Sequence, residues 1–356
     1  MARRPGLFGP RRRRIRYGCL TVVFLLMISL GLMVGLNSLS NRFVRLAVQP
    51  LTLPELPRGL EGFEILHLSD LNGATLGANH EHLRKALEGE SFQAVCLTGD
   101  MVGKSGNDEP LMALLDVLGQ KAPVFLIAGA GDPPPITGEP HGDAHVLAPY
   151  IKRAQAKGAV YLDRPVMLEE DGARIWFCPA DLFELDLESA RRAYQQRHEG
   201  LMAGDNPASP ENAAQIRLVA YQLEMLADSI AARAEMKAED TIVALRHRPP
   251  ETRLLDELRQ AAEGTAIFLP DIYLSGQYNN GQARLPGLGP IYVPRLADGP
   301  GGYFPGDEGL TGLQITQGVS LHISPGLGVS GYYPFPFRLF NRPGITIVQL
   351  TAKMTR

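Results

Sequence analysis

Residues 63–70 read FEILHLSD, a short apolar run that ends in a serine and an aspartate. Such a run is typical of a buried strand that leads into a polar loop. The pattern returns at 94–100, which read AVCLTGD, and at 123–132, which read PVFLIAGAGD. Helical patterns at 79–88 and 110–119 separate the three runs. This alternation predicts a layered α/β domain, in which ligands bind where parallel strands end.

The second half of the chain resumes the strand pattern. Residues 242–245 read IVAL and precede His247, and residues 272–276 read IYLSG after a helical pattern at 251–262. Later strands are expected within and after a tail at 277–344 that is rich in Gly and Pro, near 290–293, near 319–323 and at 345–350.

Residues 184–239 differ because they are rich in Ala, Arg, Glu and Gln and contain no strand run. Ser209 followed by Pro210 is a good helix start. An apolar stripe with helical spacing follows it, formed by Ile216, Val219, Leu223, Leu226 and Ile230. The stripe fits a helix that packs on its own domain or on a helix at 185–200. A dimer seam or a partner-binding helix pair is the alternative.

Composition and charge exclude several classes of protein. The 356 residues contain 45% hydrophobic and 21% charged residues, which is a globular balance. Three cysteines without a CxxC pair cannot build a disulfide framework or a thiolate zinc site. The formal net charge of the whole chain is −3. Residues 1–16 hold seven Arg and no acidic residue, so the rest of the chain has a net charge of −10. An acidic body offers no footprint for nucleic acid.

The N-terminal region predicts a membrane anchor. Residues 17–40 contain no charged residue and are long enough, as a helix, to cross a hydrocarbon core of ~30 Å. Basic residues precede this span, which places the N-terminus in the cytoplasm and the main domain outside it. A cleaved signal peptide is the alternative. The expected parts are a basic cytoplasmic arm at 1–16, a transmembrane signal anchor at 17–40, a linker at 41–60, and a domain at 61–356 with a helical insert at 184–239.

The polar loops resemble those of the calcineurin-like metallophosphoesterases, in particular their membrane-anchored bacterial branch. The matching segments are Ser69-Asp70-Leu71-Asn72, Gly99-Asp100, Gly129-Ala130-Gly131-Asp132, His247-Arg248-Pro249, Gly276-Gln277-Tyr278-Asn279-Asn280-Gly281-Gln282 and Arg338-Leu339-Phe340-Asn341-Arg342-Pro343. The resemblance covers about 61–351, apart from the insert. It implies an α/β fold with a layered β-sandwich flanked by helices, and a two-metal phosphoesterase site.

The resemblance also identifies which metal ligands remain. It implies that Asp70, Asp100 and His247 occupy ligand positions of the family. At the other positions the family's histidines are replaced by Asn72, Gln277 and Asn279, its asparagine by Ala130, and its leaving-group histidine by Gly131. Imidazole suits zinc, iron and manganese, whereas neutral amide oxygens are weaker ligands for these ions. We therefore expect tight binding of a metal pair to be lost.

These observations predict a membrane-anchored extracytoplasmic protein that is catalytically impaired or inactive and has a binding or scaffold role. Its remnant cleft would comprise Asp70, Asn72, Asp100, His247, Gln277 and Asn279, and would accept a phosphate- or sugar-like ligand. The alternative is an active phosphoester hydrolase with a reduced, oxygen-rich site. We expect no metal at full occupancy and, if any, a divalent cation such as Mg²⁺, Ca²⁺ or Mn²⁺. The loop with Asp132, His141, Asp143 and His145 is either a replacement metal site or a solvated loop.

Overall fold

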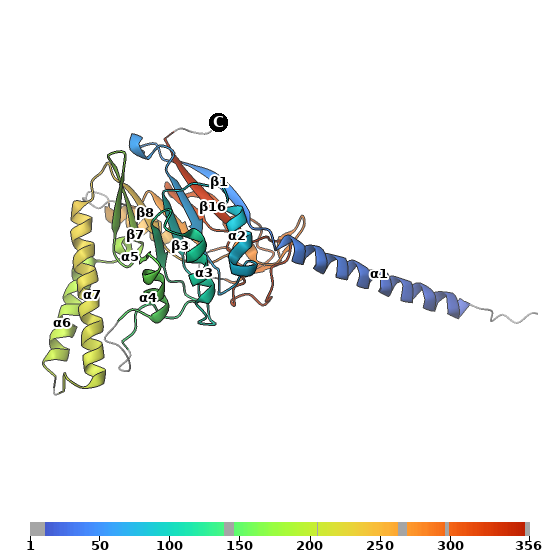
Figure 1. Ribbon diagram of the computed structural model, residues 1–356, viewed down its shortest axis with the longest axis horizontal. Coiled ribbons are helices and arrows are strands. Elements are labelled where there is room, and N and C mark those ends of the chain that lie inside the picture. The colour runs from blue at the N-terminus through green and yellow to red at the C-terminus, as the bar shows by residue number, and fades with distance from the viewer. Residues whose placement is uncertain (1–10, 139–145, 205, 263–268, 296–298, 353–356) are drawn as a thin grey trace, which may run out of the picture.

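The N-terminal helix stands apart from a layered body. The computed structural model describes residues 11–138, 146–204, 206–262, 269–295 and 299–352 (Figure 1). Helix α1 (Arg11–Ser40) projects from the body as a long arm. Its segment Gly18–Ser40 has a mean hydropathy of 2.6 and none of it is buried. This helix is long and apolar enough to span a membrane, although a signal sequence would have the same properties.

The body contains two six-stranded sheets, and the first of these is mainly parallel. β2, β3, β4 and β5 run parallel to one another, while β16 joins β2 in the antiparallel sense and β1 is parallel to β16. In spatial order its strands are β1 (Arg45–Thr52), β16 (Gly344–Thr351), β2 (Glu64–Leu68), β3 (Ala94–Thr98), β4 (Val124–Ile127) and β5 (Ala159–Tyr161).

The second sheet has a parallel centre with an antiparallel strand at each edge. β7, β8, β9 and β15 are parallel, and β6 and β14 close the edges. In spatial order its strands are β14 (Gly312–Thr316), β15 (Val319–Ile323), β9 (Ile272–Ser275), β8 (Thr241–Leu245), β7 (Ala173–Pro179) and β6 (Val166–Glu170).

The two sheets pack face to face and helices cover their outer faces. Phe125 of β4 stacks on Phe177 of β7 with ring centroids 4.4 Å apart, so one apolar layer lies between the sheets. Successive strand residues point to opposite faces, so Leu126 packs instead against the helices outside the first sheet. Those helices are α2 (Glu81–Ala86), α3 (Glu109–Leu118) and α4 (Pro149–Ala156); α5 (Asp181–Glu184), α6 (Leu187–Met202), α7 (Pro210–Glu235) and α8 (Thr252–Ala262) accompany the second sheet. The predicted mixed α/β architecture with two sheets is confirmed.

The helical insert forms a hairpin of α6 and α7, which lie side by side (Figure 1). Helix α7 begins after Ser209, whose hydroxyl accepts a hydrogen bond from the amide of Asn212 at 3.2 Å, as expected for an N-cap. Leu226 of the apolar stripe is buried in the cluster against the second sheet, and Ile230 packs on the same cluster. The stripe therefore contacts its own domain.

Residues 41–60, expected to be a linker, contribute a strand to the first sheet. β1 pairs with β16 along all eight of its residues, from Arg45 opposite Gly344 to Thr52 opposite Thr351. Leu51 is fully buried between the sheets. No local pattern predicts this pairing, because the partner strand β16 lies some 300 residues away in the chain.

Candidate functional site

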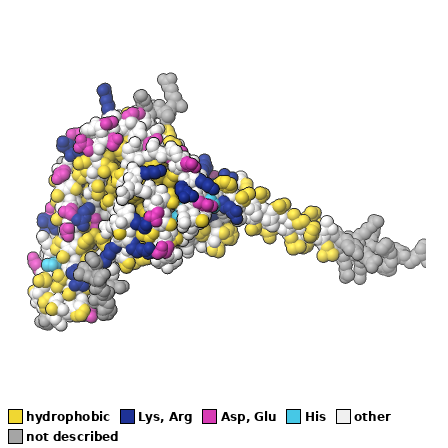
Figure 2. Space-filling view, in the orientation of Figure 1, with side chains coloured by type: hydrophobic (Ala, Val, Ile, Leu, Met, Phe, Trp, Pro, Cys, Tyr) yellow, Lys and Arg dark blue, Asp and Glu magenta, His cyan; other side chains and the backbone are white. Residues whose placement is uncertain are grey.

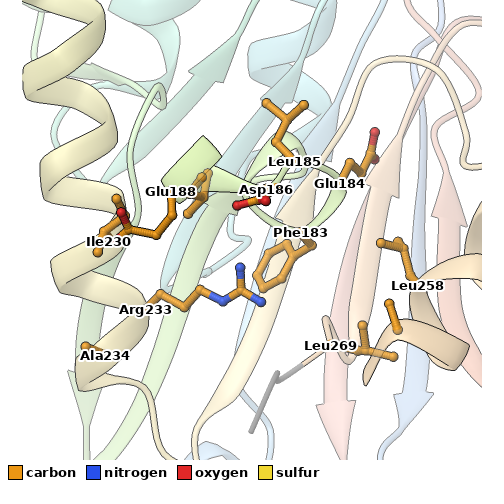
Figure 3. A pocket seen from close by; sticks show the side chains of 12 residues that line it. Phe183, Glu184, Leu185, Asp186, Glu188, Ile230, Arg233, Ala234, Leu258 and Leu269 are labelled. Carbon is orange, nitrogen blue, oxygen red and sulfur yellow. The ribbon is translucent and has the colours of Figure 1, made fainter. Parts of the chain in front are cut away.

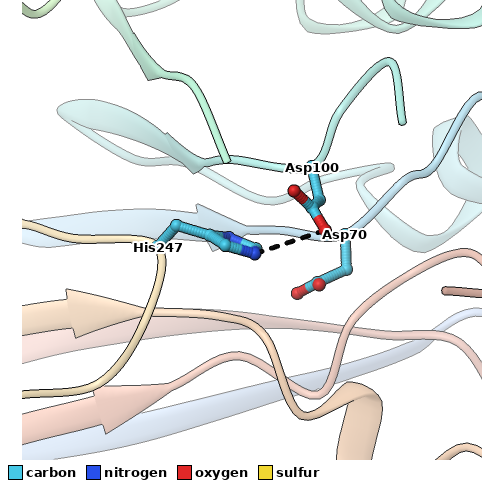
Figure 4. Close-up of side chains that lie close together, drawn as sticks. All are labelled: Asp70, Asp100 and His247. Carbon is cyan, nitrogen blue, oxygen red and sulfur yellow. Dashed lines mark ion pairs between the residues drawn. The ribbon is translucent and has the colours of Figure 1, made fainter. Parts of the chain in front are cut away.

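Three of the predicted site residues meet where strands of both sheets end. Asp70 follows β2, Asp100 follows β3 and His247 follows β8. One ligand atom from each side chain lies within 4.8 Å of the others, and all three side chains are buried (Figure 4). The ends of β2 and β3 in the first sheet and of β8 in the second bring these three residues together. The close-up shows the His247 ring pointing toward Asp100 and Asp70.

The loops that carry these residues adopt left-handed backbone conformations. φ is 55° at Asp70, 51° at Asn72, 51° at Asp100, 80° at Gln277 and 48° at Asn279. Positive φ is uncommon for residues other than glycine and costs free energy. A cluster of such conformations at the ends of adjacent strands marks a site whose side-chain positions are imposed by the surrounding fold.

His247 is held in one orientation and forms an ion pair. Its Nδ1–H donates to the carbonyl oxygen of Thr98 at 2.7 Å, so Nε2 faces the Oδ2 atom of Asp100 at 3.3 Å. Burial opposes the charged imidazole, but the hydrogen bond to Asp100 and the charges of Asp70 and Asp100 outweigh it and raise the pKa of His247 to about 9. The imidazole is therefore protonated at neutral pH.

Asp100 is fixed by a backbone amide and leaves no space for a side chain nearby. Its Oδ1 atom accepts from the amide of Gly131 at 2.6 Å. Burial acts to raise the pKa of Asp100, but the interactions with His247 and Gly131 lower it. A Cβ atom built on Gly131 would lie 2.8 Å from Oδ2 of Asp100, and one built on Gly129 would lie 2.1 Å from Oδ1. In this arrangement a histidine at position 131 would displace the Asp100 carboxylate.

Asp70 accepts hydrogen bonds on both carboxylate oxygens. Its Oδ2 atom accepts from the hydroxyl of Ser69 and from the amide of Gln277, the latter at 3.0 Å. Its Oδ1 atom accepts from Nδ2 of Asn279 at 3.1 Å. Burial is the main influence on Asp70 and raises the pKa of its carboxyl group, with Asp100 acting in the same direction and His247 against it.

Asn279 links Asp70 to Arg338, a residue to which the sequence analysis gave no role. Nη1 of Arg338 donates to Oδ1 of Asn279 at 3.3 Å, while Nδ2 of Asn279 donates to Asp70. With a guanidinium on one side and a carboxylate on the other, only this orientation of the amide makes both hydrogen bonds. The oxygen that was expected to replace an imidazole ligand therefore points to Arg338.

Arg338 is a buried cation that binds mainly backbone carbonyl groups. Its side chain is only 3% exposed, and burial lowers its pKa to about 10, so it remains charged at neutral pH. It donates to the carbonyl oxygens of Asn341 and Gly328 at 2.9 Å and of Pro325 at 3.1 Å. The signal in the sequence is the segment 338–343, which matches the family without implying a role for its arginine.

The residues present do not fit a pair of metal ions. Asn279 directs its oxygen away from the cluster, and Nδ2 of Asn72 donates to the backbone oxygen of Asp70 at 3.2 Å. Ala130 has no ligand atom, and Gly131 contributes only its amide. In their ionised forms, Asp70 and Asp100 are balanced in charge by His247 and Arg338. A neutral centre of this kind does not require cations to compensate its carboxylates.

The same centre retains ligand atoms for one cation. Oε1 of Gln277 is buried and accepts no hydrogen bond from the described residues, while Oδ2 of Asp100 and Nε2 of His247 are buried and have only each other as partners, in the ion pair at 3.3 Å. Asp70, Asp100 and His247 together form an Asp-Asp-His cluster of the kind that holds a divalent ion. Binding at Nε2 requires loss of the His247 proton, so occupancy would be coupled to pH.

The remnant cleft expected from the sequence is mostly closed. Of its six residues only Asn72 is partly exposed, and the other five are buried. His247 nevertheless borders a cavity of about 440 Å³ beside Gly129 and Arg246, whose remaining walls come mainly from apolar residues of β4, β7, α5 and α7.

A separate hollow of about 540 Å³ lies between α5, α7 and α8 (Figure 3). Arg233 and Glu184 line it with apolar neighbours such as Phe183 and Leu258, and it contains none of the predicted site residues. The polar loop at 132–145 does not supply a replacement metal site through Asp132. The Asp132 carboxylate instead accepts from the amides of Met101, Val102, Gly103 and Gly129 at 2.8–3.3 Å. His141, Asp143 and His145 lie outside the described residues.

A pair of histidines lies between the sheets, apart from the Asp70 cluster. Nδ1 of His67 on β2 and Nδ1 of His322 on β15 are 2.6 Å apart, and Nε2 of His67 hydrogen-bonds the hydroxyl of Thr98 at 2.8 Å. Both rings are fully buried. Burial lowers the pKa of His67 and lowers that of His322 to about 3, so the pair is neutral at physiological pH. This is a structural contact between the sheets.

Comparison with known proteins finds similarity to solved structures but not to any protein family or curated sequence. No family model matches the chain, and no curated protein matches its sequence. A crystal structure of phosphopantetheinyl hydrolase (PptH) from Mycobacterium tuberculosis aligns with 13% sequence identity and a TM-score of 0.38. The alignment covers 83% of this chain and 99% of that chain. A similarity of this size assigns no residue and no activity.

Proposed function

We propose that this chain is a membrane-anchored extracytoplasmic protein with a calcineurin-like metallophosphoesterase fold that has lost two-metal hydrolysis and serves as a binding or scaffold module. The order of the strand-end motifs supports the fold, and the apolar segment Gly18–Ser40 of α1 with the arginines before it supports the anchor and its orientation. The comparisons add nothing to this assignment.

One observation carries the loss of hydrolysis. Asn279 stands where the resemblance implies a metal-binding imidazole, and its amide connects Arg338 to Asp70. The positive charge that cations would supply at this edge is thus provided by the guanidinium of Arg338 and the imidazolium of His247. Replacement of metal ligands by a hydrogen-bonded, charge-balanced network gives a rigid centre without a hydroxide source.

The charges around the centre favour a phosphate-like ligand over a neutral sugar. Lys104 lies over the ring of Tyr332, with Nζ 4.1 Å from the ring centroid, and its charge acts on Asp100. Arg248 directly follows His247 and is exposed. These two cations would attract a phosphate-bearing ligand to the outer side of the cluster.

The test is hydrolysis of a generic aryl phosphodiester by the purified full-length protein in detergent, with Mn²⁺, Mg²⁺ or Ca²⁺ added in turn. We expect the rate to equal that of the Asp100→Ala variant, because no metal-dependent reaction occurs at the site. Lys121→Ala, which changes an exposed residue, is the matched control. Metal-dependent turnover that persists in the control and disappears in Asp100→Ala would contradict the proposal.

A second candidate is a hydrolase of phosphoesters that uses a single divalent cation. The Asp-Asp-His cluster and the buried Oε1 atom of Gln277, which accepts no hydrogen bond from the described residues, favour it. Asp70, Asp100 and His247 would hold the cation, and the cation would polarise a phosphoryl oxygen. The same assay separates the two candidates.

A further inference from the structure

A polar cavity of about 730 Å³ lies where α1 joins the body. Its walls come from the end of α1, from β1, from the loops at 280–284 and 311–312, and from the C-terminal segment at 340–346. Figure 2 shows Lys and Arg side chains gathered on the body beside the base of the apolar helix. The residues that line the cavity are Ser40, Arg45, Ala47, Gln49, Asn280, Arg284, Thr311, Gly312, Pro325, Phe340, Asn341, Arg342, Gly344, Ile345 and Thr346.

Hydrogen bonds hold α1 against the rim of this cavity. Nδ2 of Asn37 donates to the carbonyl oxygen of Arg338 at 2.8 Å, and Oδ1 of Asn37 accepts from the amide of Phe340 at 2.8 Å. Nε of Arg342 donates to the hydroxyl of Ser40 at 2.7 Å. Because several contacts join the helix end to one short segment, the cavity keeps a defined position relative to the helix axis.

The length of α1 places the cavity at headgroup depth. The apolar segment Gly18–Ser40 has 23 residues and is therefore about 34 Å long. A hydrocarbon core is about 30 Å thick, so Ser40 lies within or just beyond its boundary. Exposed aromatic side chains beside this end, those of Phe43, Phe337 and Phe340, suit the same boundary.

The cavity is cationic although the body as a whole is acidic. Arg45, Arg284 and Arg342 line it, and no carboxylate belongs to its described walls. Asp307 pairs with Arg284 from outside the lining, and the Arg45 side chain makes no hydrogen bond or ion pair with the described residues. Guanidinium groups bind phosphate oxygens in bidentate geometry. Because Asp307 pairs with Arg284, Arg45 and Arg342 remain as the two arginines that can bind an anion.

Gln49 adds an acceptor to this set of donors. Its Oε1 atom is buried and unpartnered among the described residues. A phosphate oxygen would repel this atom, whereas a hydroxyl group next to the phosphate would donate to it. A phosphate diester that carries a hydroxyl-bearing headgroup satisfies both kinds of group.

We propose that this cavity binds the phosphate-bearing headgroup of an anionic phospholipid in the membrane that α1 spans. The proposal rests on the membrane anchoring described under Proposed function and is independent of the Asp70 centre. Bound lipid would fix the angle between the helix and the body and hold the body against the membrane surface.

The test uses the full-length protein in mixed micelles with equimolar phosphatidylglycerol and phosphatidylcholine, followed by native mass spectrometry of the retained lipid. We expect preferential retention of phosphatidylglycerol. Each arginine removed should weaken retention about five-fold, so Arg45→Gln should show a clear loss and Arg45→Gln with Arg342→Gln a larger one. Arg253→Gln on α8, which changes an exposed arginine outside the cavity, should retain lipid as the unmodified chain does.

Competition separates a lipid from a soluble occupant. If bound phosphatidylglycerol is not displaced by millimolar glycerol 3-phosphate, the occupant is a lipid headgroup, as proposed. If glycerol 3-phosphate displaces the lipid, and Arg45→Gln no longer binds glycerol 3-phosphate, the occupant of the cationic cavity is a soluble phosphate ester and the lipid proposal is wrong. Equal retention of the two lipids, or equal loss in Arg253→Gln, would overturn the site. Failure to associate with vesicles of phosphatidylcholine alone would instead refute the anchoring.

Discussion

Replacing Arg338 by methionine is the most informative perturbation of the charged centre. Methionine keeps much of the side-chain volume but removes the guanidinium, so the carbonyl groups of Gly328, Pro325 and Asn341 lose their donor. Oδ1 of Asn279 also loses its hydrogen-bond donor, and the Asp70 carboxylate loses the nearby positive charge to which Asn279 connects it. Removing one partner of a buried charged network costs about 3–5 kcal/mol.

The magnitude can be read from thermal unfolding in mild detergent. Domains of about 150–250 residues lose roughly 2–4 °C in Tm per kcal/mol, so a cost of about 3–5 kcal/mol should make Arg338→Met lower Tm by about 6 °C or more. Arg338→Lys keeps the charge but cannot form the same set of hydrogen bonds, so its Tm should lie between those of the unmodified protein and Arg338→Met. A shift of Arg338→Met close to zero would refute the structural role given to this residue.

A double-mutant cycle with Asp70→Asn tests whether the two charges are coupled through Asn279. Once Asp70 is neutral, loss of the guanidinium no longer leaves a buried carboxylate without compensation. We therefore expect the cost of Arg338→Met to fall by about 1–2 kcal/mol in the Asp70→Asn background. Strict additivity of the two substitutions would contradict the relay.

The remaining predictions concern the frame around the centre. Acidification below about pH 6.5 should lower Tm, because unfolded histidines take up protons that the buried pair excludes; the pKa of His322 is about 3 in the fold, and His322→Asn should flatten the curve between these limits. Gly129→Ala should cost about 1–3 kcal/mol because its Cβ would meet Asp100. Ser209→Ala should cost about 1 kcal/mol through loss of the α7 cap.

Two of these predictions, those for Gly129 and for the histidine pair, have a direct comparison. Gly200 lies within α6 and a Cβ there meets no atom within 4 Å, so Gly200→Ala should stabilise the protein by up to about 1 kcal/mol. A pH profile of His322→Asn identical to that of the unmodified chain would exclude the histidine pair as the cause. Equal melting temperatures of Gly129→Ala and Gly200→Ala would contradict the packing described around Asp100.

Much of the site's location follows from the sequence because local patterns determine it. The apolar runs before Asp70 and Asp100 identify parallel strands, and such strands must bring their following loops to one edge. The Ser209 cap likewise depends only on neighbouring residues. Periodicity and turn chemistry are therefore sufficient for the alternating strands and helices, for the nearness of Asp70 to Asp100, and for the start of α7, whereas the two-sheet layering and the place of His247 come only from the family resemblance.

The role of Arg338 and the closure of the cleft could not be predicted in this way. The orientation of the Asn279 amide depends on a guanidinium 59 positions later in the chain. Whether an asparagine offers its oxygen to a metal or its nitrogen to Asp70 is a three-dimensional property. The pairing of β1 with β16 escaped prediction for the same reason, since it joins the two ends of the domain.

The metal content of the purified full-length protein tests the central claim most directly. Elemental analysis after expression with manganese, iron and zinc supplied should find less than one equivalent of these ions per chain, because the buried charges of Asp70 and Asp100 are already balanced by His247 and Arg338. Two equivalents that survive dialysis would contradict the account and would identify a complete two-metal centre.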